Sequence, residues 1–160
     1  MAKVPVQFRL NGDEVAEFVE SGATLLSLLR DKALDMSVKG GCHQGTCGAC
    51  TVIIDGALKL ACLTLAETCK DARIETVASL AQGGALHPLQ RAFVDHFATQ
   101  CGFCTSGMIL AAKVLLDHNP TPSRADVIDA ISGNICRCTG YEPIIQAILA
   151  AAQAGAPAAG

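Results

Sequence analysis

The segment GGCHQGTCGAC, residues 40–50, carries the strongest structural signal in this chain of 160 residues. Its three cysteines have the C-x4-C-x2-C spacing of plant-type [2Fe-2S] proteins, and a fourth cysteine follows after eleven intervening residues. The four glycines fit this chemistry, because they let backbone amides point inward at sulfur in conformations that a Cβ would block. The segment predicts a [2Fe-2S] site, with structural zinc and buried or disulfide-bonded cysteines as the alternatives. The cysteines concerned are Cys42, Cys47, Cys50 and Cys62.

A second set of four cysteines lies in the C-terminal half, as C-x2-C and a distant C-x-C. This spacing is less diagnostic, because four thiolates also suit zinc or a [4Fe-4S] centre. The residues are Cys101, Cys104, Cys136 and Cys138. The spacing alone therefore leaves [2Fe-2S], [4Fe-4S] and zinc open. The ninth cysteine, Cys69, has no partner at ligand spacing, and we interpret it as a small buried hydrophobic side chain.

The composition indicates a folded chain with an unusual core. Hydrophobic residues make up 51% and charged residues 17%, which excludes intrinsic disorder. There is no tryptophan and one tyrosine, so aromatic side chains contribute little buried area. Nine cysteines in such a chain suggest that inorganic centres organise each half.

Charge and hydropathy exclude several classes of protein. The net charge of −3 without a basic run argues against nucleic-acid binding. No apolar run of about 18 residues predicts a transmembrane helix, and the first ten residues resemble a strand more than a signal peptide. We therefore expect a cytoplasmic protein, in which closely spaced cysteines are metal ligands or catalytic groups more often than disulfides.

The N-terminal half has the period of strands. Apolar residues alternate over 4–10, and Asn11-Gly12 predicts a hairpin turn, with Gly12 at positive φ, leading to a second strand over 14–19. Leucines behind Thr24 predict a short amphipathic helix over 24–30 with Thr24 as its cap. Further strands are expected over 51–54, 58–63 and 73–77. We expect one α+β domain over residues 1–80.

The C-terminal half has the period of helices. A first helix is expected from Pro88, with Leu89, Phe93 and Phe97 on one face. A second is expected over about 106–117, ended by Asn119-Pro120. The third opens with a capping box of Ser123 and Asp126 and buries Val127, Ile128 and Ile131; the fourth carries Ile144, Ile145, Ile148 and Leu149.

Each cysteine loop of this half interrupts a pair of predicted helices. This repetition predicts a pseudo-twofold four-helix bundle over 81–153 that brings loops 101–104 and 136–138 together. The tail, 154–160, is predicted to be disordered.

Three segments around the cysteines make the chain resemble a known family. They are KGGCHQGTCGACTV at 39–52, QCGFCTSGM at 100–108 and GNICRCTGY at 133–141. These resemble the signatures of the small iron-sulfur subunit of the molybdenum hydroxylases, the family of xanthine dehydrogenase, aldehyde oxidoreductase and carbon monoxide dehydrogenase. The resemblance runs from about residue 4 to 152. It implies a plant-type ferredoxin-like (β-grasp) domain followed by an all-α four-helix-bundle domain, each with one [2Fe-2S] cluster.

The resemblance also implies roles for individual residues. The cysteines of the first set would hold a distal cluster near the electron acceptor, and those of the second set a buried proximal cluster. Gln100 and Cys138 would lie against the pterin of a molybdenum cofactor in a partner subunit. Ser106 stands where the family usually has proline, and His43 and Thr46 also depart from its pattern, but none of these changes removes a ligand.

By the same resemblance, the chain is an electron-transfer subunit of a multi-subunit oxidoreductase and performs no substrate chemistry itself. It would relay electrons from the molybdenum cofactor through two [2Fe-2S] clusters to FAD or another acceptor. Expected partners are a large molybdenum subunit and a medium FAD subunit, with a cytochrome acceptor as an alternative, in a heterotrimer or its dimer.

Two other functions remain open: a free-standing two-cluster ferredoxin that diffuses between partners, and a zinc-stapled interaction module. Arg137, between two proximal cysteines, would either raise the proximal cluster potential or face an interface.

Overall fold

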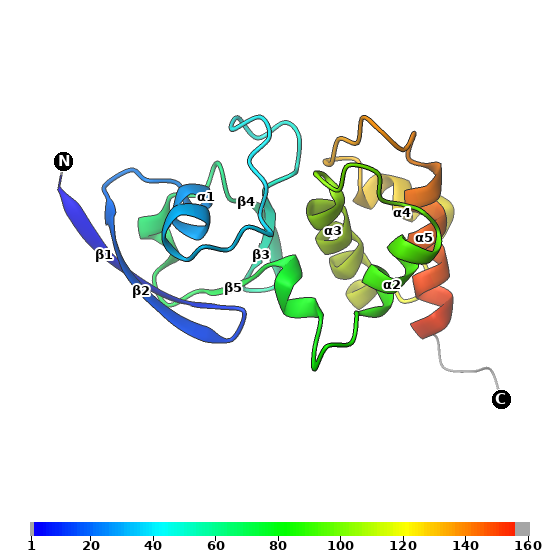
Figure 1. Cartoon of the computed structure of the whole chain (residues 1–160), viewed down its shortest axis with the longest axis horizontal. Helices are drawn as coiled ribbons and strands as arrows, with labels where there is room; N and C mark the ends of the chain where they lie inside the picture. Colours follow the sequence, from blue (N-terminus) through cyan, green and yellow to red (C-terminus); the bar gives the residue numbers. More distant parts are fainter. Residues whose placement is uncertain (1, 156–160) are drawn as a thin grey trace.

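A computed structural model describes residues 2–155 and has the expected α+β fold. A sheet with short helical segments beside it forms one half of the elongated molecule, and four helices form the other (Figure 1). The strands and helices are β1 (Lys3–Leu10), β2 (Asp13–Glu20), α1 (Leu25–Ser27), η1 (Leu28–Lys32), β3 (Thr51–Ile54), β4 (Ala57–Leu60), η2 (Ala66–Cys69), β5 (Arg73–Glu75), η3 (Val77–Leu80), α2 (Pro88–Asp95), α3 (Thr105–His118), α4 (Arg124–Ala130) and α5 (Glu142–Gly155). Within residues 2–155, every helix is too short or too polar to span a bilayer.

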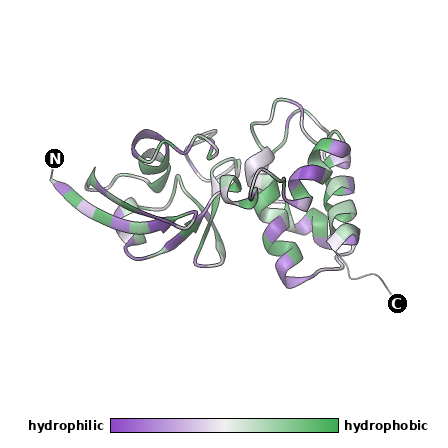
Figure 2. Ribbon diagram, turned by 60° about the horizontal axis from the view of Figure 1, so that its bottom comes forward, coloured by the Kyte–Doolittle hydropathy of each residue, from purple (hydrophilic) through white to green (hydrophobic). Residues whose placement is uncertain are grey.

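The sheet has five strands in the order β2-β1-β5-β3-β4. Strands β1 and β5 are parallel and the other pairs antiparallel. The predicted hairpin is confirmed, with Asn11 at φ 54° and Gly12 at φ 99°, the two left-handed residues that a tight Asn-Gly turn requires. Hydropathy alternates along this hairpin (Figure 2).

The predicted leucine helix forms and covers the sheet. The Thr24 hydroxyl accepts a hydrogen bond from the Ser27 amide at 3.2 Å, which confirms Thr24 as the N-cap. The helix continues as a π-helical turn, η1, so it reaches Lys32 rather than Arg30. The four leucines between residues 25 and 29 are buried with Val6 and Phe8 of β1 in the core of this half.

Two predicted strands are shorter than expected. The strand predicted over 58–63 ends at Leu60, because the chain turns there and the Ala61 amide donates to the Cys50 carbonyl at 3.1 Å. The strand predicted over 73–77 ends at Glu75. Thr76 is fully buried and bonded to the Asn11 and Asp35 side chains, and η3 begins at the next residue.

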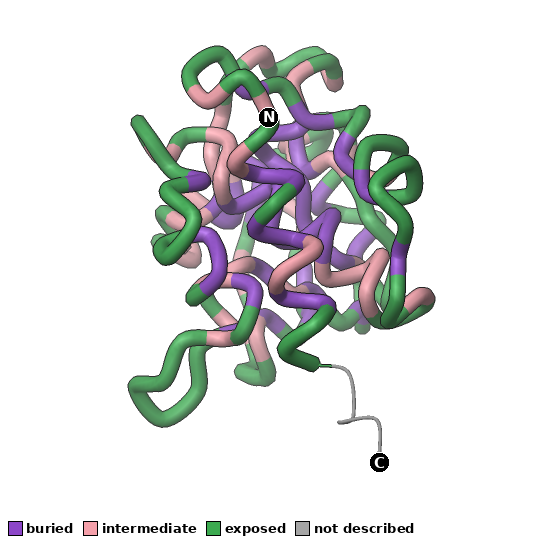
Figure 3. Tube along the Cα trace, turned by 90° about the vertical axis from the view of Figure 1, so that its right-hand side faces the viewer, coloured by how far each residue is buried: buried purple, intermediate pink, exposed green. Residues whose placement is uncertain are grey.

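The four predicted helices of the second half are confirmed as α2 to α5. Pro88 begins α2, where the His87 ring accepts from the Leu89 amide at 3.2 Å. The predicted capping box of Ser123 and Asp126 begins α4. Buried residues lie on the inner sides of the helices, and the exposed positions surround them (Figure 3).

Three predictions for this half are wrong. Phe97 lies beyond the end of α2 and is exposed, because the helix is closed by the Ala98 amide, which donates to the Phe93 carbonyl at 2.9 Å. Ile128 is exposed, because α4 turns Val127 inward instead. Residues 154–155 are helical as the end of α5, whereas 156–160 of the predicted disordered tail lie outside the described residues.

Candidate metal centres

Loop 40–50 lies between η1 and β3 and projects at the top of the view, where the sheet meets the helical half (Figure 1). Left-handed backbone at His43, Gly45 and Gly48 wraps the loop on itself. The Gln44 and Thr46 amides both donate to the Cys42 sulfur, at 3.5 and 3.3 Å. The glycine pattern therefore does what the sequence predicts: it turns backbone amides toward a thiolate.

Two glycines of this loop leave no room for a side chain. A Cβ at Gly41 would lie 2.8 Å from the Cys47 sulfur, and one at Gly45 would lie 2.4 Å from a methyl group of Leu63. At Gly41 the backbone thus forms a cradle close to the Cys47 sulfur, which is the close approach that a sulfide-bridged cluster needs.

The thiols of this first set occupy two different environments. Cys42 is at the rim, where hydrogen bonds from the Thr46 side chain and the Gln44 amide lower its pKa to about 5. Cys50 and Cys62 are buried side by side, and burial raises the pKa of Cys50 to about 11. A bound iron ion would remove this cost, because it stabilises the thiolate over the thiol.

The second set of cysteines forms two adjacent pairs. The Cys138 and Cys101 sulfurs are 3.6 Å apart, and the Cys104 and Cys136 thiols interact with each other. The first pair is exposed, whereas the second lies toward the helical core. Sequence repetition predicts that these two loops meet, and the structure confirms it.

Opposing influences act on the charge of these four thiols. Thr105, the first residue of α3, directly follows Cys104, so the positive end of the helix dipole lies at the cysteine loop. The Phe103 amide lowers the pKa of Cys101, whereas the hydrogen bond with Cys101 raises the pKa of Cys138. Burial raises the pKa of Cys104 to about 12. Burial opposes ionisation of Cys136 too, but hydrogen bonds from Thr139 outweigh it and lower the pKa.

The paired geometry fits a two-iron cluster better than a single ion. Structural zinc requires four ligands around one point. A [2Fe-2S] cluster instead takes two thiolates at each of two irons, so two neighbouring pairs suit it.

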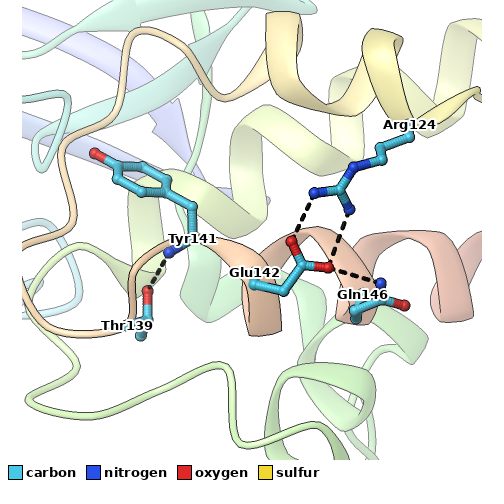
Figure 4. A network of polar contacts seen from close by, with 5 residues as sticks. All are labelled: Arg124, Thr139, Tyr141, Glu142 and Gln146. Carbon is cyan, nitrogen blue, oxygen red and sulfur yellow. Dashed lines mark hydrogen bonds and ion pairs between the residues drawn. The ribbon is translucent and has the colours of Figure 1, made fainter.

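Polar contacts fasten the second loop to the helices (Figure 4). The Thr139 hydroxyl lies 3.1 Å from the Cys136 sulfur and accepts from the Tyr141 amide at 3.2 Å. The Tyr141 hydroxyl accepts from the Cys136 amide at 3.0 Å. Arg124 of α4 makes a bidentate ion pair with Glu142 at the start of α5, at 2.6 and 3.1 Å. Sequence reasoning missed these supports, although Thr139 and Tyr141 stand in the GNICRCTGY segment.

The first cysteine loop also touches the helical half directly. The Ile135 amide donates to the Cys47 carbonyl at 2.9 Å, and the buried Asn134 side chain donates to the Gly48 carbonyl at 3.0 Å. A Cβ at Gly107 of α3 would lie 2.3 Å from that same Gly48 oxygen. The two cysteine sets are thus joined through backbone contacts, which the sequence did not predict.

The other candidate functional residues differ in their exposure to solvent. Gln100 is exposed beside Cys101, and His43 and Arg137 are exposed without an ion pair in the described part of the chain. Cys69 is buried, as predicted, and burial raises its pKa. Ser106 is buried, and within residues 2–155 its hydroxyl has no hydrogen-bond partner.

Comparison with known proteins agrees with this geometry. Residues 76–149 match the family described as [2Fe-2S] binding domain, and residues 15–95 match the 2Fe-2S iron-sulfur cluster binding domain. The chain is 46% identical to the nicotine 6-hydroxylase small subunit of Paenarthrobacter nicotinovorans, over 92% of this chain and 88% of that one. It is 44% identical to the nicotinate dehydrogenase small FeS subunit of Eubacterium barkeri, over 92% and 94%.

Two solved structures have the same fold as this chain. Quinoline 2-oxidoreductase from Pseudomonas putida 86 superposes with a TM-score of 0.92 at 46% identity, over 95% of both chains. The aldehyde oxidoreductase from Desulfovibrio desulfuricans superposes with a TM-score of 0.90 at 42% identity, over 94% of this chain but 17% of that longer one.

Proposed function

Because this chain belongs to the small [2Fe-2S] subunits of the molybdenum hydroxylases, we propose that the eight cysteines of its two sets hold two clusters in a fixed order. The chain is the iron-sulfur electron-transfer subunit of a multi-subunit oxidoreductase, and the comparisons give no support to a free-standing ferredoxin. The molybdenum cofactor belongs to another subunit of such complexes.

We assign the distal cluster to loop 40–50 together with Cys62, and the proximal cluster to the two bundle loops. The amides aimed at Cys42 and the glycine cradle support the first assignment. The two thiol pairs at the start of α3 support the second. When bound, each cluster supplies a carrier for one electron at a time. The ligand sets are Cys42, Cys47, Cys50 and Cys62, and Cys101, Cys104, Cys136 and Cys138.

One observation carries the proposed relay. The Cys47 carbonyl accepts the Ile135 amide at 2.9 Å, and Ile135 directly precedes Cys136 in the chain. A ligand of each set is therefore joined to the other by one hydrogen bond and a few covalent bonds. Such a short link holds the two cysteine loops against each other and so favours a short distance between the two clusters.

The exposure of the proximal cysteines gives the relay a direction. Cys101 and Cys138 face solvent, with Gln100 exposed beside them, whereas Cys104 and Cys136 face inward. We propose that the large molybdenum subunit covers this face, with Gln100 and Cys138 against the pterin. We further propose a medium FAD subunit or a cytochrome as the acceptor at the rim of loop 40–50, in a heterotrimer or its dimer. Two domains meeting near residue 80, and a cytoplasmic location, complete the proposal.

Purification through a tag on this chain from its native host tests the function. We expect molybdenum to copurify, with about four iron and about four acid-labile sulfide per chain and two distinct EPR signals on reduction. Cys42→Ser should remove one signal and Cys104→Ser the other. A monomer with full iron and no molybdenum would favour a diffusible ferredoxin, and a colourless protein would indicate zinc.

A further inference from the structure

Phe97 combines two unfavourable features at one position. Its side chain is 81% exposed, and its backbone lies in the left-handed region at φ 52°, which a bulky residue rarely adopts. The Phe97 amide donates to the Val94 carbonyl at 3.1 Å and the Ala98 amide to the Phe93 carbonyl at 2.9 Å. These two bonds close α2 as a Schellman motif, in which the left-handed position is usually glycine.

Neither the local structure nor the core explains a phenylalanine at this position. Glycine would adopt the same backbone without steric cost, and the ring lies outside the buried cluster of the helical half. Val94, in the last turn of α2, is exposed as well. The Val94 and Phe97 side chains, here termed the α2 knob, therefore present apolar surface to solvent at a strained backbone. Strain of this kind persists mainly where it serves a function.

Phe97 of the α2 knob lies in the same loop as Cys101, one of the two outward-facing proximal cysteines. Phe97 precedes the exposed Gln100 by three positions and Cys101 by four, and the Cys101 sulfur is 3.6 Å from that of Cys138. A redox partner of the proximal site must approach on this side, because the other two thiols face inward. Leu34 is also exposed at positive φ, but it is not part of a cysteine loop.

We propose that the Phe97 ring anchors this chain to the large molybdenum subunit by entering an apolar pocket of that subunit. The inference rests on the proposed function, since it needs that subunit as the partner. Interfaces of this kind place a few aromatic anchors in desolvated pockets, and these carry most of the affinity. Because the left-handed backbone already holds the ring outward, the ring loses little conformational entropy on binding. The strained backbone of the free chain thus preorganises the ring for the complex.

The test is Phe97→Gly, which should change two quantities in opposite directions. In the isolated, cluster-loaded chain, glycine relieves the left-handed strain, so the thermal midpoint should rise while iron content and both EPR signals stay unchanged. In the complex purified through this chain, loss of the ring should weaken association at least tenfold. We would measure the molybdenum-to-iron ratio retained on serial dilution. A role in the fold alone would lower the thermal midpoint instead.

Phe18→Ala is the matched control, because Phe18 is also an exposed aromatic, at 62%, but lies on β2. It should leave the molybdenum-to-iron ratio at the wild-type value on dilution. Equal retention of molybdenum by wild type and Phe97→Gly would overturn the anchor, as would equal losses in the two variants. If wild type itself retains no molybdenum, it is the proposed function that fails.

Discussion

Replacing Gly107 with alanine is expected to push apart the two cysteine loops that meet at the start of α3. Gly107 is helical, so alanine alone would stabilise the helix by about 1 kcal/mol. Its Cβ, however, would lie 2.3 Å from the Gly48 oxygen and 2.7 Å from the Asn134 amide nitrogen. A carbon and an oxygen need about 3.3 Å or more, so the Gly48 carbonyl must retreat by about 1 Å.

The energetic cost follows from this displacement. Overpacking of a tight contact costs about 1–3 kcal/mol, which equals or exceeds the helical gain. The retreat also strains the hydrogen bond from Asn134 to the Gly48 carbonyl, now 3.0 Å, and carries Cys47 and Cys50 away from the helical half. We therefore expect a protein of equal or lower stability, by up to about 2 kcal/mol, with both clusters present and a longer distance between them.

The assay is EPR of the fully reduced protein, because magnetic coupling between two reduced clusters weakens steeply with their separation. Gly107→Ala should reduce the coupling while iron content stays at the wild-type value. Gly155→Ala is the control, since Gly155 is also helical but has nothing within 4 Å of an added Cβ. Unchanged coupling together with a gain in stability would refute the reasoning, because it would mean that the junction does not set the separation.

Three further predictions concern stability and metal content. Asn134→Ala removes one hydrogen bond from the Gly48 carbonyl, which keeps those from the Thr51 amide and hydroxyl, so denaturant unfolding should show a loss of about 0.5–1.5 kcal/mol; unchanged stability would contradict this. Cys69→Ala should leave iron and sulfide unchanged, because this buried thiol lies outside both ligand sets, and a fall in iron would make it a ligand after all. The Ser123 amide holds the pKa of Asp126 below its usual range. The stability that this cap contributes is therefore present above the pKa of Asp126 in the unfolded chain, and it is lost as pH falls through the pKa in the folded chain. When pH is lowered below about 4, the thermal midpoint should fall less in Asp126→Asn than in wild type.

Local signals in the sequence predicted the elements that depend on a few neighbouring residues. The Asn11-Gly12 turn, the Thr24 cap and the Ser123 capping box each rest on contacts within three positions, and all three form. Such contacts depend on side-chain chemistry and backbone freedom, which can be read along the chain.

The predictions that failed depend on where an element stops. Helical spacing places Phe97 on the same face as Phe93, but the spacing does not reveal that the backbone turns left-handed after α2. The usual signal for a helix end at this position is glycine, so a phenylalanine there does not indicate that the helix ends. The strand predicted over 73–77 failed for a related reason: Thr76 leaves it to bond Asn11, 65 positions earlier.

The cysteine sites likewise have features that the local sequence predicts and features that depend on distant residues. Spacing within each loop indicated the candidate ligands, whereas the contact between the loops joins Asn134 to Gly48, 86 positions apart. Nothing in the local pattern predicts that the Asn134 side chain joins the two halves. The pairing of Cys104 with Cys136 also needs the bundle, since only packing of α3 beside the second loop brings them together.

Small residues stand where the two halves meet because the two proposed clusters must be held close together at a fixed distance. At Gly48 and Gly107 the backbone of one half touches that of the other, and any larger side chain would separate them. The contact is also rigid, because Ile53 of β3 packs in the hydrophobic core of the helices rather than in the core of its own sheet. The two halves therefore share one core at their junction. A flexible linker between independent domains would let the separation of the clusters vary, whereas a shared core holds it constant while partner subunits bind and release.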